Sequence, residues 1–343
     1  MADDVPAPMP QTQIIRRLLF TAGVLLVYRL GCQVPAPGVN TDVLVGLGGV
    51  LKTESVSIFA LGVTPFFSVL FVFELIKLFV PPVARWETRE FRNAQRLSLA
   101  IYLLALVSAG FQASGLANAF NGVTGLVDEP GWENIIAITL VAGTALLCWL
   151  GERITLHGLG NGFWLLLITP MLATAPGIVA GSLVLMRQGA IQPNAIGAAV
   201  VFLVVATALI AMTANAARTS GENRVSGADF VTVWPPLLAA FISGFVVTFY
   251  ELAAGGAAHL GLMAALIAAF NGLQWLGATP ATRRPVWAIA LVQIFVCTGA
   301  ELFTQASMLP FPINGPWLIV IVITAMSCLR AIGKQASEQK PAA

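Results

Sequence analysis

The feature that most constrains this chain is a series of long apolar segments. A helix that crosses a bilayer needs about 20 mostly apolar residues, and ten segments of the chain reach that length. The segments lie at about 15–34, 57–80, 95–117, 135–155, 160–183, 193–217, 230–252, 257–277, 284–305 and 313–332. Because backbone polar groups inside a bilayer must bond to one another, we expect an all-α polytopic membrane protein with ten transmembrane helices.

The composition agrees with a membrane protein and excludes other classes. Of the 343 residues, 57% are hydrophobic and 10% are charged, whereas soluble domains carry about 25% charged residues. The net charge of +2 is too small for a nucleic-acid-binding surface. We therefore expect no nucleic-acid partner and no separate extramembrane domain.

Lysine and arginine are concentrated in every second loop, which predicts the orientation. Cytoplasmic loops of membrane proteins carry an excess of these residues. The residues placed on the cytoplasmic side by this rule are Arg16, Arg17, Arg85, Arg89, Arg92, Arg96, Arg153, Arg218, Arg224, Arg283, Arg284, Arg330, Lys334 and Lys340. The loop around Asp128 and Glu133 has no basic residue and is expected outside. Both termini are thus predicted to be cytoplasmic, in a bacterial inner membrane, and the polar residues 1–14 do not resemble a cleavable signal peptide.

Charged residues within the apolar segments are few. Glu74 and Lys77 are three residues apart, so they share a helix face and form a candidate intramembrane pair. Arg29, near the end of the first segment, could extend its head group to the interface. A structural pair and a functional pair both remain open for Glu74 and Lys77.

We predict neither a metal site nor a cofactor nor an enzyme. His157 and His259 are far apart and have no ligand-like neighbours. No HExxH motif, aspartate pair or serine–histidine pair at helical spacing is present. The cysteines lack CxxC spacing and are expected to be packing residues; they are Cys32, Cys148, Cys297 and Cys328.

Three motifs are more specific than composition. The first comprises RRLLF at 16–20, VYRLG at 27–31 and VPAPGV at 34–39. The second is SIFALGVTPF at 57–66, and the third is WLGERIT at 149–155 followed by GLGNG at 158–162. In this order they resemble SecY, the central subunit of the Sec protein-conducting channel. Two weaker matches, VWP at 233–235 and LPF at 309–311 with Gly315, resemble the starts of that family's seventh and tenth helices.

Two residue patterns have an alternative interpretation. The glycines at 158, 160 and 162 could suggest a phosphate loop, but no strand precedes them, so they more readily let a loop approach a helix. Pro65 could be an ordinary kink, whereas the resemblance implies that the second helix breaks there.

The resemblance implies two inverted five-helix halves around an hourglass pore. Its segments would be a cytoplasmic tail at 1–14, an N-terminal half at 15–183, a C-terminal half at 184–332 and a cytoplasmic tail at 333–343. A seam between the second and seventh helices would open towards lipid. A ring of apolar side chains would seal the waist, at Val63, Phe67, Phe163, Leu167, Leu237 and Val320. The spacing of four within the first two pairs puts each pair on one helix face.

The chain departs from the family pattern in three loops. Family members usually carry a plug helix before the second helix, but 42–56 has room only for a plug stub, with Asp42, Gly48 and Gly49 as its candidate residues. The connections at 218–230 and 276–284 are also short. We therefore expect weak or no docking of a ribosome or motor ATPase through the usual loops.

The sequence predicts a reduced, divergent SecY-like channel or membrane insertase subunit. It would secrete or insert a narrow set of polypeptide substrates, in contact with the lipid bilayer and with a small SecE-like subunit. The alternatives are a non-conducting SecY-like paralogue and a small-molecule transporter on the same fold.

Overall fold

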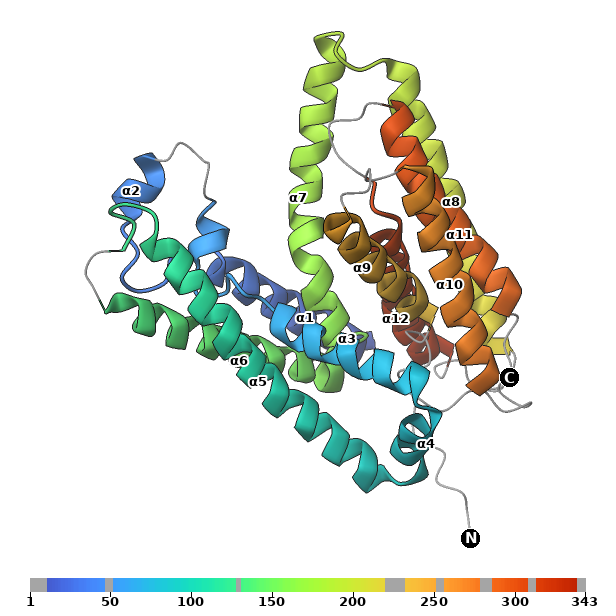
Figure 1. Cartoon of the computed structure of the whole chain (residues 1–343), viewed down its shortest axis with the longest axis horizontal. Coiled ribbons are helices and arrows are strands. Elements are labelled where there is room, and N and C mark those ends of the chain that lie inside the picture. Colours follow the sequence, from blue (N-terminus) through green and yellow to red (C-terminus); the bar gives the residue numbers. More distant parts are fainter. Residues whose placement is uncertain are drawn as a thin grey trace. The chain divides into compact units, whose positions relative to one another are not determined.

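The computed structural model describes residues 11–46, 52–127, 131–219, 232–250, 256–277, 286–307 and 313–337. The described parts are mostly helical (Figure 1). In chain order the helices are α1 (Gln11–Gly31), α2 (Thr41–Gly46), the 3-10 turn η1 (Thr53–Val56), α3 (Thr64–Phe79), α4 (Pro81–Arg89), α5 (Phe91–Asn121), α6 (Trp132–His157), α7 (Gly162–Arg187), α8 (Pro193–Thr219), α9 (Trp234–Phe249), α10 (Ala257–Gly277), α11 (Val286–Ser307) and α12 (Gly315–Ser337).

Each predicted apolar segment contains a helix, but the count of ten spans is not confirmed. Within the described residues, seven helices are long and apolar enough to cross a membrane: α5, α6, α7, α8, α10, α11 and α12. The number rises to eight if α3 and α4, which are bent by 112°, are one broken span. The fold is all-α, as predicted, and the chain is a multi-pass membrane protein.

Three predicted spans fall short for different physical reasons. Helix α1 carries Arg16, Arg17 and Arg29, which lower its hydropathy. Helix α9 has only 16 residues. Helix α3 begins at Thr64 instead of 57, with Pro65 in its first turn, where a missing N–H costs nothing. Pro65 therefore starts a helix instead of kinking one.

The chain forms two compact units. Unit 1 comprises residues 1–73, 85–169 and 328–343, and unit 2 comprises 74–84 and 170–327. These boundaries differ from the predicted halves at 15–183 and 184–332, which remain a prediction about repeat symmetry.

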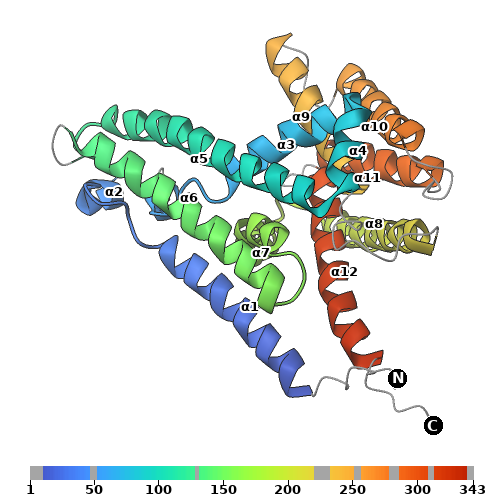
Figure 2. The same cartoon turned by 90° about the horizontal axis from the view of Figure 1, so that it is seen from below.

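Unit 1 is built on the antiparallel pair of α5 and α6, which lie side by side (Figures 1 and 2). Helix α5 presents an alanine every fourth residue, and each is almost fully buried: Ala105, Ala109, Ala113 and Ala117. Small residues let helices approach closely in a membrane. Ile136, Leu140 and Leu147 of α6 are fully buried in the same unit, and α1 packs on α6.

At the turn between α6 and α7, the backbones of the two helices come into close contact. A Cβ on Gly162 would lie 2.0 Å from the carbonyl oxygen of Gly151, so no larger residue fits without displacing α6. The Thr155 hydroxyl accepts a hydrogen bond from the Gly162 N–H at 2.9 Å. Asn161 Oδ1 accepts one from the Phe163 N–H at 3.1 Å and so caps α7. The glycine motif acts as predicted, by letting a loop approach a helix.

Unit 2 contains α8, α9, α10 and α11, with α10 beside both α9 and α11. Helices α8 and α11 meet through the stacked rings of Phe202 and Phe303, whose centroids are 5.6 Å apart. A Cβ on Gly299 would lie 3.2 Å from the Phe202 ring, so the glycine makes room for this contact.

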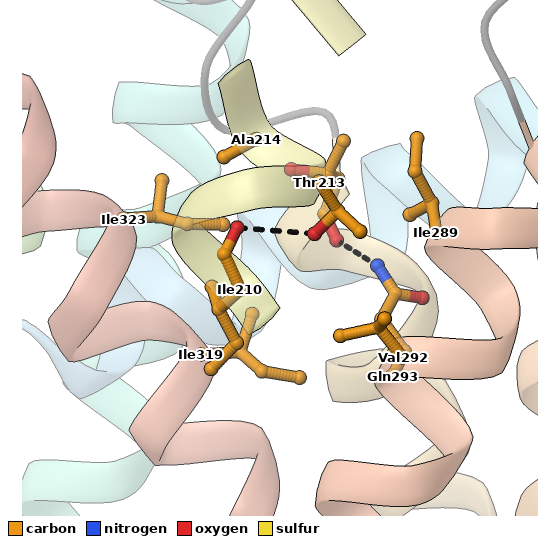
Figure 3. Close-up of a pocket in the computed structure, with 9 residues that line it drawn as sticks. Ile210, Thr213, Ala214, Ile289, Val292, Gln293, Ile319 and Ile323 are labelled. Carbon is orange, nitrogen blue, oxygen red and sulfur yellow. Dashed lines mark hydrogen bonds between the residues drawn. The ribbon is translucent and has the colours of Figure 1, made fainter. Parts of the chain in front are cut away.

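A buried polar network fixes the start of α9, and Figure 3 shows its Gln293 side chain. Pro236 has no N–H, so the Thr232 carbonyl lacks the donor that a helix supplies four residues later. The Gln293 Nε2 of α11 donates to that carbonyl at 2.7 Å. The Asn271 Nδ2 of α10 donates to Gln293 Oε1 at 2.8 Å and also to the Ile267 carbonyl at 2.8 Å. The side chains of Gln293 and Asn271 thus replace the hydrogen bond that Pro236 removes.

A small cavity adjoins this network. It has a volume of about 10 Å³ and is lined by residues of α8, α11 and α12 and by Thr232 before α9, with Thr213, Thr232 and Gln293 as the polar residues (Figure 3). The Thr213 hydroxyl donates to the Ile210 carbonyl at 3.0 Å. A cavity of this size has room for about one water molecule, which is far less than an organic solute needs.

Replacing Gln293 by Leu should destabilise the protein by about 1–3 kcal/mol, the cost of leaving buried polar groups without partners. Thr232 would lose its donor and Asn271 one acceptor. Unfolding of the purified protein in mixed micelles would measure the loss. The matched control is Gln112→Leu on α5, which removes only a bond to the Ser108 hydroxyl and should change stability by less than about 0.5 kcal/mol. Equal losses in both variants would contradict the role of the network.

Gly162→Ala should cost roughly 1–3 kcal/mol, because a new methyl group would overlap the Gly151 carbonyl and force α6 and α7 apart. Thermal unfolding in detergent would measure it. Gly181→Ala is the control on the same helix, since nothing lies within 4 Å of its added Cβ. We expect Gly181→Ala to be neutral or mildly stabilising, and an unchanged Gly162→Ala melting temperature would refute the close contact.

Candidate functional site

Four of the six predicted waist residues belong to unit 1. Val63 and Phe67 lie at the start of α3 and are buried. Phe163 and Leu167 lie in the first two turns of α7 and are half-buried. Val63 belongs to one apolar cluster with α1 and α6, against which Phe163 and Leu167 pack. The other cluster members are Val24, Tyr28, Cys32, Phe59, Leu147, Leu150, Ile154 and Leu166.

The aromatic contact between α3 and α7 uses a residue that the sequence analysis missed. The ring of Phe66, not that of Phe67, lies 5.1 Å from the ring of Phe163. Phe66 also lies 5.0 Å from Tyr102 of α5, whereas Phe67 contacts Phe71 one turn along its own helix. Successive residues of a helix point about 100° apart, so the backbone rotation of α3 decides which phenylalanine meets α7. The only signal in the sequence was that the two aromatics are adjacent.

The remaining two waist residues belong to unit 2. Leu237 is buried in the first turn of α9, directly after the segment held by Gln293. Val320 of α12 is fully buried, next to Ile319 at the wall of the small cavity. The polar network therefore sets the position of Leu237. Because the six residues are divided between two units, their joining into one ring remains a prediction.

All six side chains are apolar, which limits what they can do. A constriction lined by such groups repels hydrated ions because it loses water. Among the described residues, no group of three His, Cys, Asp or Glu side chains could hold a metal ion. The chemistry available here is exclusion of ions and contact with apolar segments.

Two ion pairs lie outside the candidate waist. Glu74 and Lys77 of α3 do face each other and form an ion pair; a functional role for this pair remains a prediction. Arg29 forms the other pair, since its Nη2 lies 2.9 Å from Glu54 Oε1 in η1. Local spacing could not predict this pair, because Arg29 and Glu54 are 25 positions apart in the sequence.

The predicted plug stub is only partly described. Asp42 is the second residue of α2, and its backbone N–H donates to Asn40 Oδ1 at 3.0 Å. Gly48 and Gly49 lie outside the described residues. So do most of the two short connections at 218–230 and 276–284, including Arg224, Arg283 and Arg284.

The chain is similar in sequence to bacterial SecY proteins. A family profile described as SecY matches residues 57–220. The protein translocase subunit SecY of Buchnera aphidicola subsp. Acyrthosiphon kondoi is 33% identical over 198 residues, which are 52% of this chain and 55% of the relative. The subunit of Escherichia coli strain K12 is also 33% identical over 198 residues, covering 44% of its length. The chain thus spans about half the length of these curated relatives.

The fold is similar to solved Sec channels over nearly the whole chain. A SecY structure, described as one in which the plug domain stabilises the closed state and maintains a membrane seal, matches with a TM-score of 0.62 and 13% identity. Sec61 in a canine ribosome–channel complex matches with a TM-score of 0.62 and 14% identity. Each match covers 99% of this chain and 97% of the other. Sequence similarity in the region of α3 to α8 and fold similarity from end to end support a relationship of this chain to the SecY family.

Proposed function

We propose that this protein is a protein-conducting channel or membrane insertase subunit. The observation that carries the proposal is its fold, which matches Sec channels over 99% of the chain. The starts of α3 and α7 support it, because their side chains Val63, Phe67, Phe163 and Leu167 are apolar, as the proposed sealing waist requires.

The proposed mechanism involves no bond chemistry. A polypeptide would pass through the channel while apolar side chains close around it and exclude hydrated ions. An apolar segment would leave sideways into lipid, gaining a few tenths of a kcal/mol for each strongly apolar residue. Further energy would come from a partner protein or from the membrane potential.

The membrane, the orientation and the partner subunit of the channel are also part of the proposal. The chain would lie in a bacterial inner membrane with both termini in the cytoplasm, and would bind a small SecE-like subunit. The short connections at 218–230 and 276–284 favour a narrow substrate set and weak or no docking of ribosomes or motor ATPases there.

Photocrosslinking tests the proposed function. A photoreactive phenylalanine analogue at Phe67 should form adducts with substrate polypeptides in cells, because Phe67 would contact any chain that passes the waist. The control position is Phe111 of α5, which is 78% exposed on the helix surface and should yield mainly lipid adducts. Equal polypeptide adducts from both positions, or none from Phe67, would contradict a channel and leave a non-conducting paralogue. Solute uptake by proteoliposomes without adducts would instead indicate a small-molecule transporter.

The orientation has its own test, in a variant without the four native cysteines. Thr124→Cys, in the exposed turn between α5 and α6, should react with a membrane-impermeant thiol reagent in spheroplasts. Arg89→Cys, at the end of α4, should react only after lysis, because the basic residues around it are expected inside. The reverse pattern would invert the proposed topology.

A further inference from the structure

We propose that residues 39–46 form a fixed strut and not a plug that moves when the channel opens. The strut joins the end of α1 to the tip of the α5–α6 pair, where residues 122–127 turn. The part of this inference that concerns opening rests on the proposed channel function. The attachment of the strut to the α5–α6 pair does not depend on that function.

The backbone of the strut is tied to the α5–α6 turn. Val39 and Val127 form an antiparallel bridge, and the Asn40 N–H donates to the Leu126 carbonyl at 2.8 Å. Just before the bridge, Gly38 has a φ of 85°, and a Cβ there would lie 2.5 Å from the indole of Trp132. Only glycine accommodates both this conformation and this contact, so the turn places Val39 against α6.

Helix α2 is then held by one face (Figures 1 and 2). Leu44 is 7% exposed, whereas its neighbour Val45 is 80% exposed. Leu44 belongs to the apolar cluster that includes α5 and α6 side chains, namely Ala113, Ala117, Phe120, Ile136 and Leu140. Asn40 caps the helix, since its Oδ1 accepts hydrogen bonds from the Asp42 and Val43 N–H groups. A plug would need to leave this position, and doing so would expose Leu44 and break the backbone ties.

The other end of the connection is equally fixed. Val56 is fully buried in the same cluster as Leu44. The Ala36 N–H donates to the Val56 carbonyl at 2.8 Å, and the Ile58 N–H donates to the Val34 carbonyl at 3.0 Å. The Arg29–Glu54 ion pair adds a side-chain contact beside these bonds. Both ends of the segment between α1 and α3 are thereby anchored within unit 1.

In a similar SecY channel, the plug domain is described as stabilising the closed state and maintaining a membrane seal. With 39–46 held on the α5–α6 pair, closure would depend on the apolar waist side chains. The opening motion would then leave α2 in place.

A first experiment tests the attachment without any transport assay. Leu44→Ala should lower the melting temperature of the purified protein by about 5 °C, because the strut is part of the cooperatively folded unit. Val45→Ala removes an apolar group of similar size from the exposed face and should leave the melting temperature unchanged. Two unchanged melting temperatures would overturn the strut, since a loosely attached segment opens locally without affecting global unfolding.

A second experiment tests whether the strut stays in place during transport. In a variant without native cysteines, Val39→Cys and Val127→Cys would be introduced together. The Asn40–Leu126 hydrogen bond makes this a close, non-hydrogen-bonded pair, whose Cα atoms are about 4.5 Å apart, within the range of a disulfide. The readout is polypeptide crosslinking from a photoreactive residue at position 67, in the oxidised and the reduced protein.

The outcomes separate the two proposals. Adduct yields within about twofold in the two redox states would support a strut that stays in place. Loss of at least tenfold on oxidation, restored by reduction, would overturn it and show that the segment must move. Absence of adducts in both states would refute the channel function, and the Leu44→Ala result would still decide the attachment.

Discussion

The structure depends on one constraint: a backbone polar group that is shielded from water must find a partner inside the protein. Helices meet this constraint by themselves along most of their length. It becomes difficult where a proline removes an N–H, as Pro236 does at the start of α9. The Gln293 side chain of α11 then supplies the missing donor, and Asn271 of α10 in turn donates to Gln293 Oε1. The hydrogen bond that Pro236 removes from α9 is thus replaced by contacts with other helices. These contacts hold α9 against α10 and α11.

Close packing in this protein relies on small residues, alanine and glycine, as much as on large side chains. Alanines at every fourth position of α5 let it lie against α6, and Gly162 lets the start of α7 meet the Gly151 carbonyl. In an apolar solvent there is little hydrophobic gain from bringing helices together, so van der Waals contact must stabilise the pair. This packing brings Phe163 and Leu167 against the cluster around Val63.

The same unit explains why the segment between α1 and α3 differs from a plug. Its polar backbone groups are bonded at both ends, to α1 and to the α5–α6 turn, and its apolar side chains Leu44 and Val56 complete a core. A segment that contributes to a core cannot leave it without a cost in stability. A channel built this way would be closed by side chains that shift by small amounts, not by a helix that is displaced.

The sequence by itself determined the all-α membrane fold and the approximate positions of the long helices, because length and hydropathy suffice for a helix whose backbone bonds are local. The resemblance to SecY came instead from the motifs at 16–39, 57–66 and 149–162. The sequence also identified the glycine turn and the pairing of Glu74 with Lys77, which follow from spacing along one segment. The count of ten full spans is not confirmed within the described residues, because the arginines of α1 lower its hydropathy and α9 has only 16 residues. Only the tertiary structure decided that Phe66 faces Phe163, that Arg29 pairs with Glu54, that Gln293 completes α9 and that α2 packs on α5 and α6. Each of these contacts joins residues far apart in the chain or depends on the rotation of a helix about its axis. The hydropathy pattern determines neither the long-range contacts nor the rotation.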